Sequence, residues 1–426
     1  MDLSSIRDTM LDGTTKGIPG TTAPFSLALI GTKGWNVLAE DLPLPLMVLK
    51  RSSLDHNAKV FEDYLTTNGL SFAPHGKTTM TPQIFAEQLA HGAWAMTAAT
   101  VNQVKVMRRF GVARIILANQ LLGRSHVQTI AAEINADPAF EFYCFVDSVE
   151  QFRNIERHLA STSLTTPIRL LVEIGVKGGR TGVRGGEAGL ALIEAIHASD
   201  SAKFRFSGLA AFEGVVPGIA KDTSPVDAFA ETIATFARDI PEEAYAGLDE
   251  FILTGGGSSY FDIVATHFKA VALPVPVRVV LRSGCYVTHD SGGYDAAQRA
   301  ALADPHRHWS GELKPALEAW AYVQSMPELG LALLTMGKRD IPYDSGLPVP
   351  LKLYRPGIGW LDIGEAEVFA TNDQHAYVRL GKGADWQVGD MVASGISHPC
   401  TAFDKWRFIP VINDNYDVID GILTFF

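Results

Sequence analysis

The chain has 426 residues, with 36 lysine and arginine residues against 47 aspartate and glutamate residues, so its formal net charge is −11. That length allows one large domain and a smaller one, and a hydrophobic content of 47% predicts a packed globular protein. The acidic balance without a basic block argues against nucleic-acid or anionic-membrane partners, and no apolar run is long enough to predict a membrane span.

The first forty or so residues show little periodicity. They open without a basic segment before an apolar core, so no signal peptide is predicted. Three cysteines cannot build a disulfide framework, and we expect a reducing cytoplasm. Residues 45–49 then form a short apolar run that predicts a strand, and Ser53 is the expected N-cap of the helix that follows.

From there a short apolar strand, a polar turn and an amphipathic helix alternate eight times, which predicts a (β/α)8 TIM-like barrel. A doubly wound open sheet is the structural alternative. The strands are expected near Leu70–Pro74, Ala93–Thr97, Arg114–Ala118, Glu141–Val146, Ile168–Ile174, Phe204–Ala210, Glu250–Thr254 and Val277–Leu281.

After about residue 310 the pattern changes to short stretches of alternating apolar and polar residues with Gly and Pro between them. This pattern is typical of a domain of antiparallel strands. The expected organisation is therefore an N-terminal segment at 1–50, a barrel at 51–290 and a β-domain at 291–426, with the barrel boundary anywhere between about 285 and 315.

Lys77 follows the first predicted barrel strand, in the run Pro74-His75-Gly76-Lys77-Thr78. The carboxyl edge of a barrel holds its active site, whereas the opposite edge is mostly structural. A lysine placed there after a helix-breaking Pro-His-Gly can form a Schiff base with an aldehyde cofactor when its pKa is lowered. The alternative is an ordinary loop lysine.

Thr254 and the triplet Gly255, Gly256 and Gly257 follow the seventh predicted strand and precede an apolar helical stretch. Consecutive glycines let backbone N–H groups converge on a phosphate, and a helix N-terminus adds a favourable dipole. Phosphate sites in barrels commonly use the loops after strands seven and eight. The alternative is a plain flexible turn.

His398 and Cys400 lie two residues apart in the predicted β-domain. In an extended segment such residues point to the same side, and an imidazole and a thiolate so placed can share a metal, zinc first. Two protein ligands leave positions open to water and substrate, as catalytic zinc requires. The alternative is a packed thiol beside a surface histidine.

Two more side chains lie at the predicted catalytic edge. Arg180 follows the fifth strand, where its planar donor fork can pair with a cofactor or a substrate carboxylate, or serve a structural turn. Tyr286 follows the eighth strand, within expected reach of the cofactor. Its neighbour Cys285 is expected to be a small core filler.

Together these runs resemble the D-serine dehydratase and D-threonine aldolase family of pyridoxal-phosphate enzymes, which have the alanine-racemase-like fold. The resemblance covers nearly the whole chain from about residue 40. It rests on the lysine motif, Gly179 to Val183, the glycine triplet, Gly284-Cys285-Tyr286 and His398-Pro399-Cys400. The lysine motif and the late His-x-Cys, in this order, are its specific part.

The resemblance implies that Lys77 carries pyridoxal 5'-phosphate, that Thr254 and the glycine triplet bind its phosphate, and that Arg180 and Tyr286 lie near it. It also implies that His398 and Cys400 hold Zn2+, with Mn2+ or another divalent metal as the alternative. The isolated strand near Leu49 would join the β-domain, and the chain would form a homodimer with active sites at or near the interface.

Within that family, dehydratase-type members resemble His-x-Cys and aldolase-type members His-x-Asp, so Cys400 favours a dehydratase. The expected reaction converts a small D-3-hydroxy amino acid such as D-serine into a keto acid and ammonia, with Lys77, His398 and Cys400 as catalytic residues. A metal-dependent D-threonine-type aldolase is the first alternative. A racemase would give the metal pair no role, and a non-catalytic pyridoxal-phosphate carrier would resemble the barrel half alone.

Overall fold

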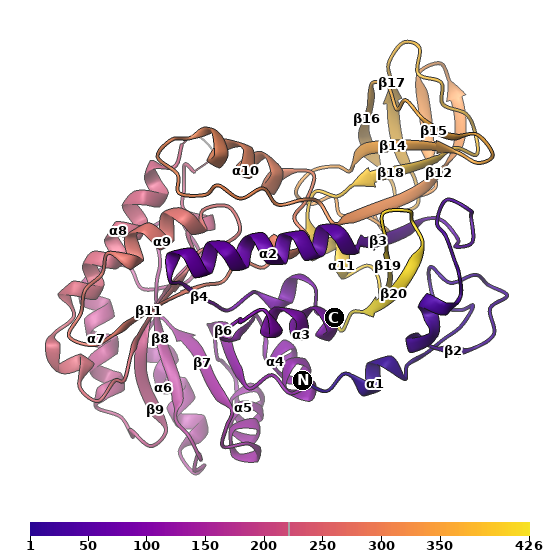
Figure 1. The fold of residues 1–426 in the computed structure, drawn as a ribbon. Coiled ribbons are helices and arrows are strands. Elements are labelled where there is room, and N and C mark those ends of the chain that lie inside the picture. Colours follow the sequence, from indigo (N-terminus) through magenta and orange to yellow (C-terminus); the bar gives the residue numbers. More distant parts are fainter. Residues whose placement is uncertain (220–221) are drawn as a thin grey trace.

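The computed structural model describes residues 1–219 and 222–426. Its larger part is built around a sheet of eight parallel strands (Figure 1). Their order in the sheet is β4-β11-β10-β9-β8-β7-β6-β5. The two ends of this order meet where the Trp94 N–H donates to the Phe72 carbonyl at 2.7 Å and where His75 bridges Thr97. The sheet therefore closes into a barrel. The strands are β4 (Ser71–Phe72), β5 (Met96–Ala98), β6 (Arg114–Gln120), β7 (Glu141–Val146), β8 (Ile168–Ile174), β9 (Phe204–Ala211), β10 (Phe251–Gly255) and β11 (Val277–Leu281).

Helices cover the outside of the barrel because each one presents an apolar stripe to the strands. In α6 the Ser148 hydroxyl caps the first turn by accepting from the Gln151 N–H at 3.2 Å, and Phe152 and Ile155 are fully buried. No helix in the described ranges is long and apolar enough to cross a membrane. The helices are α2 (Arg51–Asn68), α3 (Pro82–Ala90), α4 (Val101–Arg109), α5 (Arg124–Ala136), α6 (Val149–Leu159), α7 (Gly186–His197), α8 (Ser224–Asp239), α9 (Phe261–Lys269) and α10 (Gly293–Ala303).

Side chains fill the inside of the barrel, so no channel runs through it. Strands β7 and β8 are buried along nearly their whole length, as expected for parallel strands covered on both faces. A ligand can therefore bind only at an edge of the barrel. The interior cluster consists of Ala73, Ala95, Ile116, Tyr143, Phe145, Leu171, Ala210, Ile252 and Val280.

The second sheet has ten strands and forms the C-terminal β-domain. Strand β3 (Leu46–Lys50) comes from before the barrel and pairs with β12, where Leu317 lies opposite Leu49. The predicted fold class, including this N-terminal strand, is confirmed, and the doubly wound alternative is excluded. The limits at residues 50 and 290 stay a prediction. The other strands are β12 (Leu317–Glu328), β13 (Leu331–Leu334), β14 (Val349–Arg355), β15 (Gly359–Leu361), β16 (Ala366–Thr371), β17 (Ala376–Leu380), β18 (Met391–Gly395), β19 (Phe408–Ile412) and β20 (Val418–Leu423).

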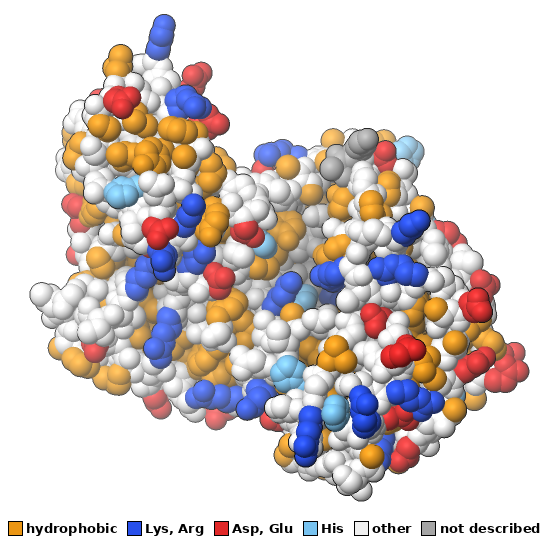
Figure 2. Space-filling model, turned by 180° about the vertical axis from the view of Figure 1, so that it is seen from behind, with side chains coloured by type: hydrophobic (Ala, Val, Ile, Leu, Met, Phe, Trp, Pro, Cys, Tyr) orange, Lys and Arg blue, Asp and Glu red, His pale blue; other side chains and the backbone are white. Residues whose placement is uncertain are grey.

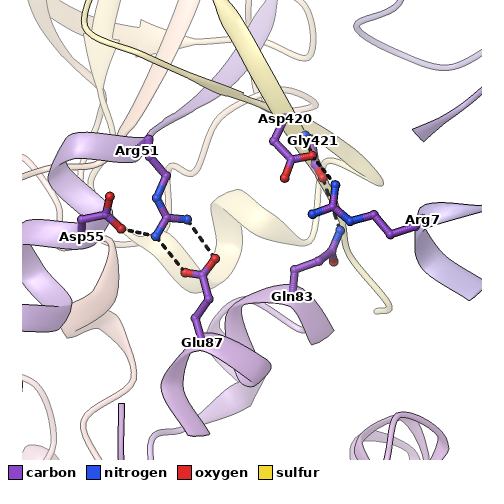
Figure 3. A network of polar contacts seen from close by, with 7 residues as sticks. All are labelled: Arg7, Arg51, Asp55, Gln83, Glu87, Asp420 and Gly421. Atoms are coloured by element: carbon purple, nitrogen blue, oxygen red, sulfur yellow. Dashed lines mark hydrogen bonds and ion pairs between the residues drawn. The ribbon is translucent and has the colours of Figure 1, made fainter. Parts of the chain in front are cut away.

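Polar contacts tie the barrel to the β-domain and to the N-terminal segment, which opens with α1 (Ser4–Arg7) (Figure 3). Helix α3 contacts both α2 and β20, and α1 contacts β20 from the other side. These contacts fix the β-domain relative to the catalytic edge of the barrel. They are the Arg51–Glu87 ion pair at 2.8 Å, the Gln83 Nε2 donation to the Gly421 carbonyl at 3.3 Å and the Arg7–Asp420 ion pair at 3.0 Å.

One local prediction in this region is wrong. Helix α2 begins at Arg51 directly after β3, with Lys50 at its cap position and no side-chain cap. Ser53 is instead buried inside the first turn. The strand runs into the helix without a loop, so the helix begins two residues before Ser53 and Ser53 does not cap it.

Candidate active site

A cavity of about 400 Å³ lies at the carboxyl edge of the barrel, where the β-domain meets it. Its wall is built from the loops after β4, β9, β10 and β11 and from the short helix α11 (Pro399–Phe403). Lys77, Gly257, His398 and Cys400, all expected from the sequence, lie on this wall. Seen from behind, the molecule is hollowed between the two domains, and basic and histidine side chains gather around the hollow (Figure 2).

Lys77 lies in a single 3-10 turn, Gly76–Thr78, immediately past the first barrel strand. A Cβ on Gly76 would lie 2.4 Å from the Met107 side chain, so glycine allows this turn to pack tightly against the barrel helices. Within the described residues the Lys77 amine makes no hydrogen bond or ion pair. It is therefore available to a ligand in the cavity.

The His75 ring also faces the cavity, two residues before Lys77. Its Nδ1 atom is buried and has no partner among the described residues. Burial, reinforced by the charges of Lys77 and Arg282, lowers the pKa of His75 well below its ordinary value. The imidazole is thus neutral at physiological pH, with a polar atom that a ligand can satisfy.

The glycine loop forms the anion-binding geometry that the sequence predicted, but a side chain already uses it. Gly256 has a φ of +76°, and its N–H donates to Glu213 Oε2 at 3.2 Å. The Gly257 N–H donates to Glu213 Oε1 in a short contact. Burial raises the pKa of Glu213, while the glycine N–H groups and Arg282 oppose that shift. A carboxylate of the chain itself thus lies where a phosphate was expected.

Thr254 and Gly255, which precede Gly256 and Gly257, make structural contacts. The Thr254 hydroxyl donates to the Val280 carbonyl at 2.8 Å and accepts from Arg282 at 2.7 Å, which holds β10 to β11. A Cβ on Gly255 would lie 3.0 Å from Val264 of α9. Neither Thr254 nor Gly255 lines the cavity. Of the predicted phosphate-binding run, only Gly257 lines the cavity, and Gly256 contacts the same Glu213 carboxylate.

The arginine on the cavity wall is Arg282, not Arg180. Arg180 is exposed, with its guanidinium 4.9 Å from the centre of the Phe212 ring. Arg282 follows β11, is 6% exposed and donates to the Ala211 carbonyl and to Thr254. Burial lowers the pKa of the Arg282 guanidinium and the Glu213 carboxylate opposes that shift, so a fixed cation remains at the cavity floor.

The structure does not bring Tyr286 to the cavity either. Its ring packs among aromatic side chains of the core, 4.5 Å from Phe61 and 5.1 Å from Phe72 between ring centres. Its hydroxyl accepts from Gln88 Nε2 at 3.2 Å. The tyrosines that line the cavity are Tyr260, before α9, and Tyr294 of α10.

His398 reaches the cavity from the β-domain, where a second carboxylate holds its ring. His398 Nδ1 lies 2.6 Å from Asp344 Oδ2, and the Thr401 hydroxyl donates to the other Asp344 oxygen at 2.7 Å. The Cys400 thiolate raises the pKa of His398 to about 9, and Asp344 acts in the same direction. Asp344 thereby fixes one ring nitrogen and leaves Nε2 for a ligand.

Cys400 lies in the first turn of α11, so the expected extended geometry of the pair is wrong. Pro399 occupies the first helical position, which its fixed φ favours, and His398 precedes the helix with extended backbone. Both side chains nevertheless line the same cavity. The Cys400 sulfur lies 3.7 Å from the sulfur of Cys285 and 3.5 Å from the Thr78 hydroxyl.

The donor atoms of this pair suit a borderline metal such as zinc. Within the described residues no group of three or more His, Cys, Asp or Glu side chains is arranged to hold a metal ion. His398 and Cys400 therefore stand as a two-ligand set, which leaves coordination positions for water and substrate.

The cavity also suits an aldehyde cofactor with a phosphate group. It contains an uncommitted lysine amine, an unpartnered buried histidine nitrogen and a loop whose N–H groups already hold a carboxylate. An oxyanion-binding loop beside an amine nucleophile is the combination that such a cofactor needs.

Sequence reasoning missed Glu213, Arg282 and Asp344. Glu213 and Arg282 each follow a barrel strand directly, at β9 and β11, so the rule that located Lys77 could have found them. Asp344 has no comparable signal, because it lies in the loop between β13 and β14 and meets His398 only through the fold.

A closed parallel barrel with a lysine after its first strand, completed by an antiparallel domain, defines the alanine-racemase-like class of folds. Solved structures of this class resemble the chain over most of its length. The D-threonine aldolase of Filomicrobium marinum has a TM-score of 0.74 and 22% identity, covering 92% of this chain and 96% of that one. The D-threo-3-hydroxyaspartate dehydratase of a Delftia species has a TM-score of 0.69 and 18% identity, covering 92% and 99%. Variants of that dehydratase with a histidine or a cysteine changed to alanine are also similar, the cysteine variant in a metal-free form.

Sequence comparisons identify more specific relatives within this class of folds. Residues 316–412, which include α11, match the family model "Putative serine dehydratase domain". The D-threonine aldolase of an Arthrobacter species is 25% identical over 375 residues, covering 87% of this chain and 89% of that protein. The chain thus resembles the D-serine dehydratase and D-threonine aldolase-like family, through this C-terminal match and through relatives that span most of its length. Aldolases and dehydratases are both lyases, so the expectation of a lyase is confirmed.

Proposed function

We propose that this chain is a pyridoxal-phosphate- and zinc-dependent lyase that converts a D-3-hydroxy amino acid, D-serine first, into a keto acid and ammonia. The observation that carries the proposal is the single cavity in which Lys77, Gly257, His398 and Cys400 meet. These residues come from distant parts of the sequence and from two domains, and each supplies a different group that the reaction needs.

Lys77 would hold the cofactor, and Gly256 and Gly257 would bind its phosphate once Glu213 turns away from their N–H groups. The cofactor supplies an electron sink for the bond that breaks at the substrate Cα. Arg282 would supply a fixed positive charge at the cavity wall, and His75 would offer its unpartnered nitrogen as a hydrogen-bonding partner. The phosphate and the lysine thus anchor two ends of one bound molecule.

The Lys77 amine is also the proposed general base. This amine lies on the cavity wall, from where it could take the Cα proton of a substrate bound beside the cofactor. Lys77 would therefore both anchor the cofactor and move the proton.

His398 and Cys400, which both line the cavity, are the proposed metal ligands, and Asp344 holds the imidazole at Nδ1, which leaves Nε2 for the metal. Zinc bound there supplies a Lewis acid for the β-hydroxyl of the substrate. The thiolate favours zinc over magnesium or calcium. Both residues line the same cavity as Lys77, so a substrate bound there could meet the general base and the metal together.

Aldol cleavage of a D-3-hydroxy amino acid is the second candidate, because a curated relative over most of the chain is named as an aldolase. In that reaction the β-hydroxyl loses its proton and the Cα–Cβ bond breaks. Elimination remains our first choice because the ligand pair is a histidine and a cysteine two residues apart, and a cysteine is also one of the residues changed in the related metal-free dehydratase.

The oligomeric state and location are also proposals. A homodimer is supported by apolar side chains exposed on the β-domain, among them Ile358, Trp360 and Phe369 (Figure 2), because such patches mark interaction surfaces. Three free cysteines favour a reducing cytoplasm.

The test supplies the full chain with pyridoxal phosphate and zinc and incubates it separately with D-serine and D-threonine, with the L-enantiomers as controls. We expect a keto acid and ammonia in equal amounts from each D-substrate and no product from the L-forms. Glycine and acetaldehyde from D-threonine would instead identify an aldolase. No turnover of either substrate would refute the lyase and favour a non-catalytic carrier of the cofactor.

A further inference from the structure

Two of the three cysteines in the chain meet at the cavity wall. Cys285 lies in a 3-10 turn after β11 of the barrel, and Cys400 lies in α11 of the β-domain. Their sulfur atoms are 3.7 Å apart, and the Thr78 hydroxyl lies 3.5 Å from Cys400 and 3.9 Å from Cys285. The third cysteine, Cys144, is fully buried in β7 away from the cavity.

We propose that Cys285 and Cys400 form a peroxide-sensitive modification site that closes to a disulfide in the metal-free protein. The Cys400 sulfur attacks one oxygen of hydrogen peroxide, breaks the O–O bond and becomes a sulfenic acid as water leaves. The Cys285 sulfur then attacks the Cys400 sulfur and a second water leaves. Two thiols lose two protons and two electrons, and one molecule of hydrogen peroxide becomes two of water.

The geometry supports both steps. Cys285 is 4% exposed and Cys400 is only partly buried, but both line a cavity that an oxidant can enter. A disulfide requires a sulfur separation of about 2.05 Å, so the pair must close by roughly 1.7 Å, a movement of the size that side-chain torsion changes produce. Because the two residues belong to different domains, the bond would link the barrel to the β-domain.

The consequence for the active site rests on the proposed function. A sulfur in a disulfide is no longer a thiolate, and only the thiolate binds a metal. Oxidation would therefore remove Cys400 from the metal pair, and a bound metal would in turn protect Cys400 from oxidation. Cys285, which the sequence indicated was a core filler, becomes the partner in this reaction.

The test uses the full-length chain with its cofactor after chelation, treated with hydrogen peroxide and then denatured and alkylated without reduction. We expect the number of alkylated cysteines to fall from three to one, with a peptide map that links Cys285 to Cys400 and leaves Cys144 free. A thiol reductant should restore all three. Three alkylated cysteines after treatment, or a link that includes Cys144, would overturn the proposal.

Two variants and one ligand complete the design. Cys144→Ala should still form the bond, whereas Cys285→Ala should form none and should accumulate a Cys400 sulfenic acid that dimedone traps. Zinc-saturated protein should keep three alkylated cysteines. If the bond forms equally fast with zinc present, the modification site stands but Cys400 is not a metal ligand, so this failure of the proposed function is separable from a failure of the inference.

Discussion

Replacing Asp344 with asparagine should weaken zinc binding without removing either proposed ligand. Asp344 holds His398 Nδ1 at 2.6 Å, and the substitution exchanges a charge-assisted hydrogen bond for a neutral one. Bonds to charged groups contribute about 1.5–3 kcal/mol, but the Asp344 side chain is 43% exposed, which screens its charge. We therefore expect zinc binding to weaken by an amount near the lower limit, about 1.4 kcal/mol, which is a tenfold increase in Kd. This lies within the roughly 10–100-fold effect of residues that orient metal ligands.

The assay is competition for zinc between the protein and a chromophoric chelator at fixed pH. His398→Ala measures the effect of losing a whole ligand. Asp373→Asn is the matched control, because that carboxylate is exposed and, among the described residues, forms an ion pair only with Arg339, at 3.4 Å. The Asp344→Asn value should lie between the two. An unchanged Kd would show that Asp344 does not orient the ring, and a loss as large as that of His398→Ala would show that it acts as a ligand itself.

Three further expectations concern the cofactor loop, the metal pair and acid stability. Gly257→Ala should weaken pyridoxal-phosphate binding about tenfold, because its Cβ would lie 2.8 Å from Phe212. Fluorescence titration measures the affinity, with Gly293→Ala, where a Cβ meets no other atom, as the control. Equal affinity of the two variants would make the loop an ordinary turn. Chelation, or Cys400→Ala, should reduce D-serine deamination at least about 100-fold and leave the absorbance of the bound cofactor unchanged; full activity in metal-free protein would leave Cys400 as a packed thiol. Burial lowers the pKa of His289 to about 4, from 6.5 in the unfolded chain. Between pH 6.5 and 4 the unfolded state therefore gains a proton that the folded state does not, so the free energy of unfolding should decrease over that range. His289→Asn, which tolerates the left-handed backbone there, should flatten that part of a Tm-against-pH curve, and an unchanged slope would contradict the assignment.

The barrel strands could be predicted because each is a short apolar run between polar turns, a pattern that burial on both faces requires. Lys77 followed from the rule that barrel active sites lie at the carboxyl edge. The same rule did not distinguish Arg282 from Arg180, because the choice depends on which side chain turns inward after its strand. The rule also does not show that the Tyr286 ring turns into the core beside Phe61.

The contacts between distant segments could not be read from the sequence. Asp344 approaches His398, and Glu213 fills the glycine loop, only because loops of different strands converge at one edge. The pairing of Cys285 with Cys400 depends in addition on how the β-domain sits on the barrel. His398 and Cys400 both line the cavity, and their role as metal ligands stays a prediction. Their extended backbone was predicted wrongly, because Pro399 starts a helix where a strand was expected.

Borohydride reduction followed by peptide mapping tests most directly whether Lys77 carries the cofactor. The reagent fixes the bond between a lysine and the cofactor's aldehyde, and mass spectrometry then locates the pyridoxyl group on a peptide. We predict one pyridoxyl group per chain, on Lys77, with no covalent label in Lys77→Ala. A label on another lysine, or an equal label in Lys77→Ala, would contradict the proposed mechanism.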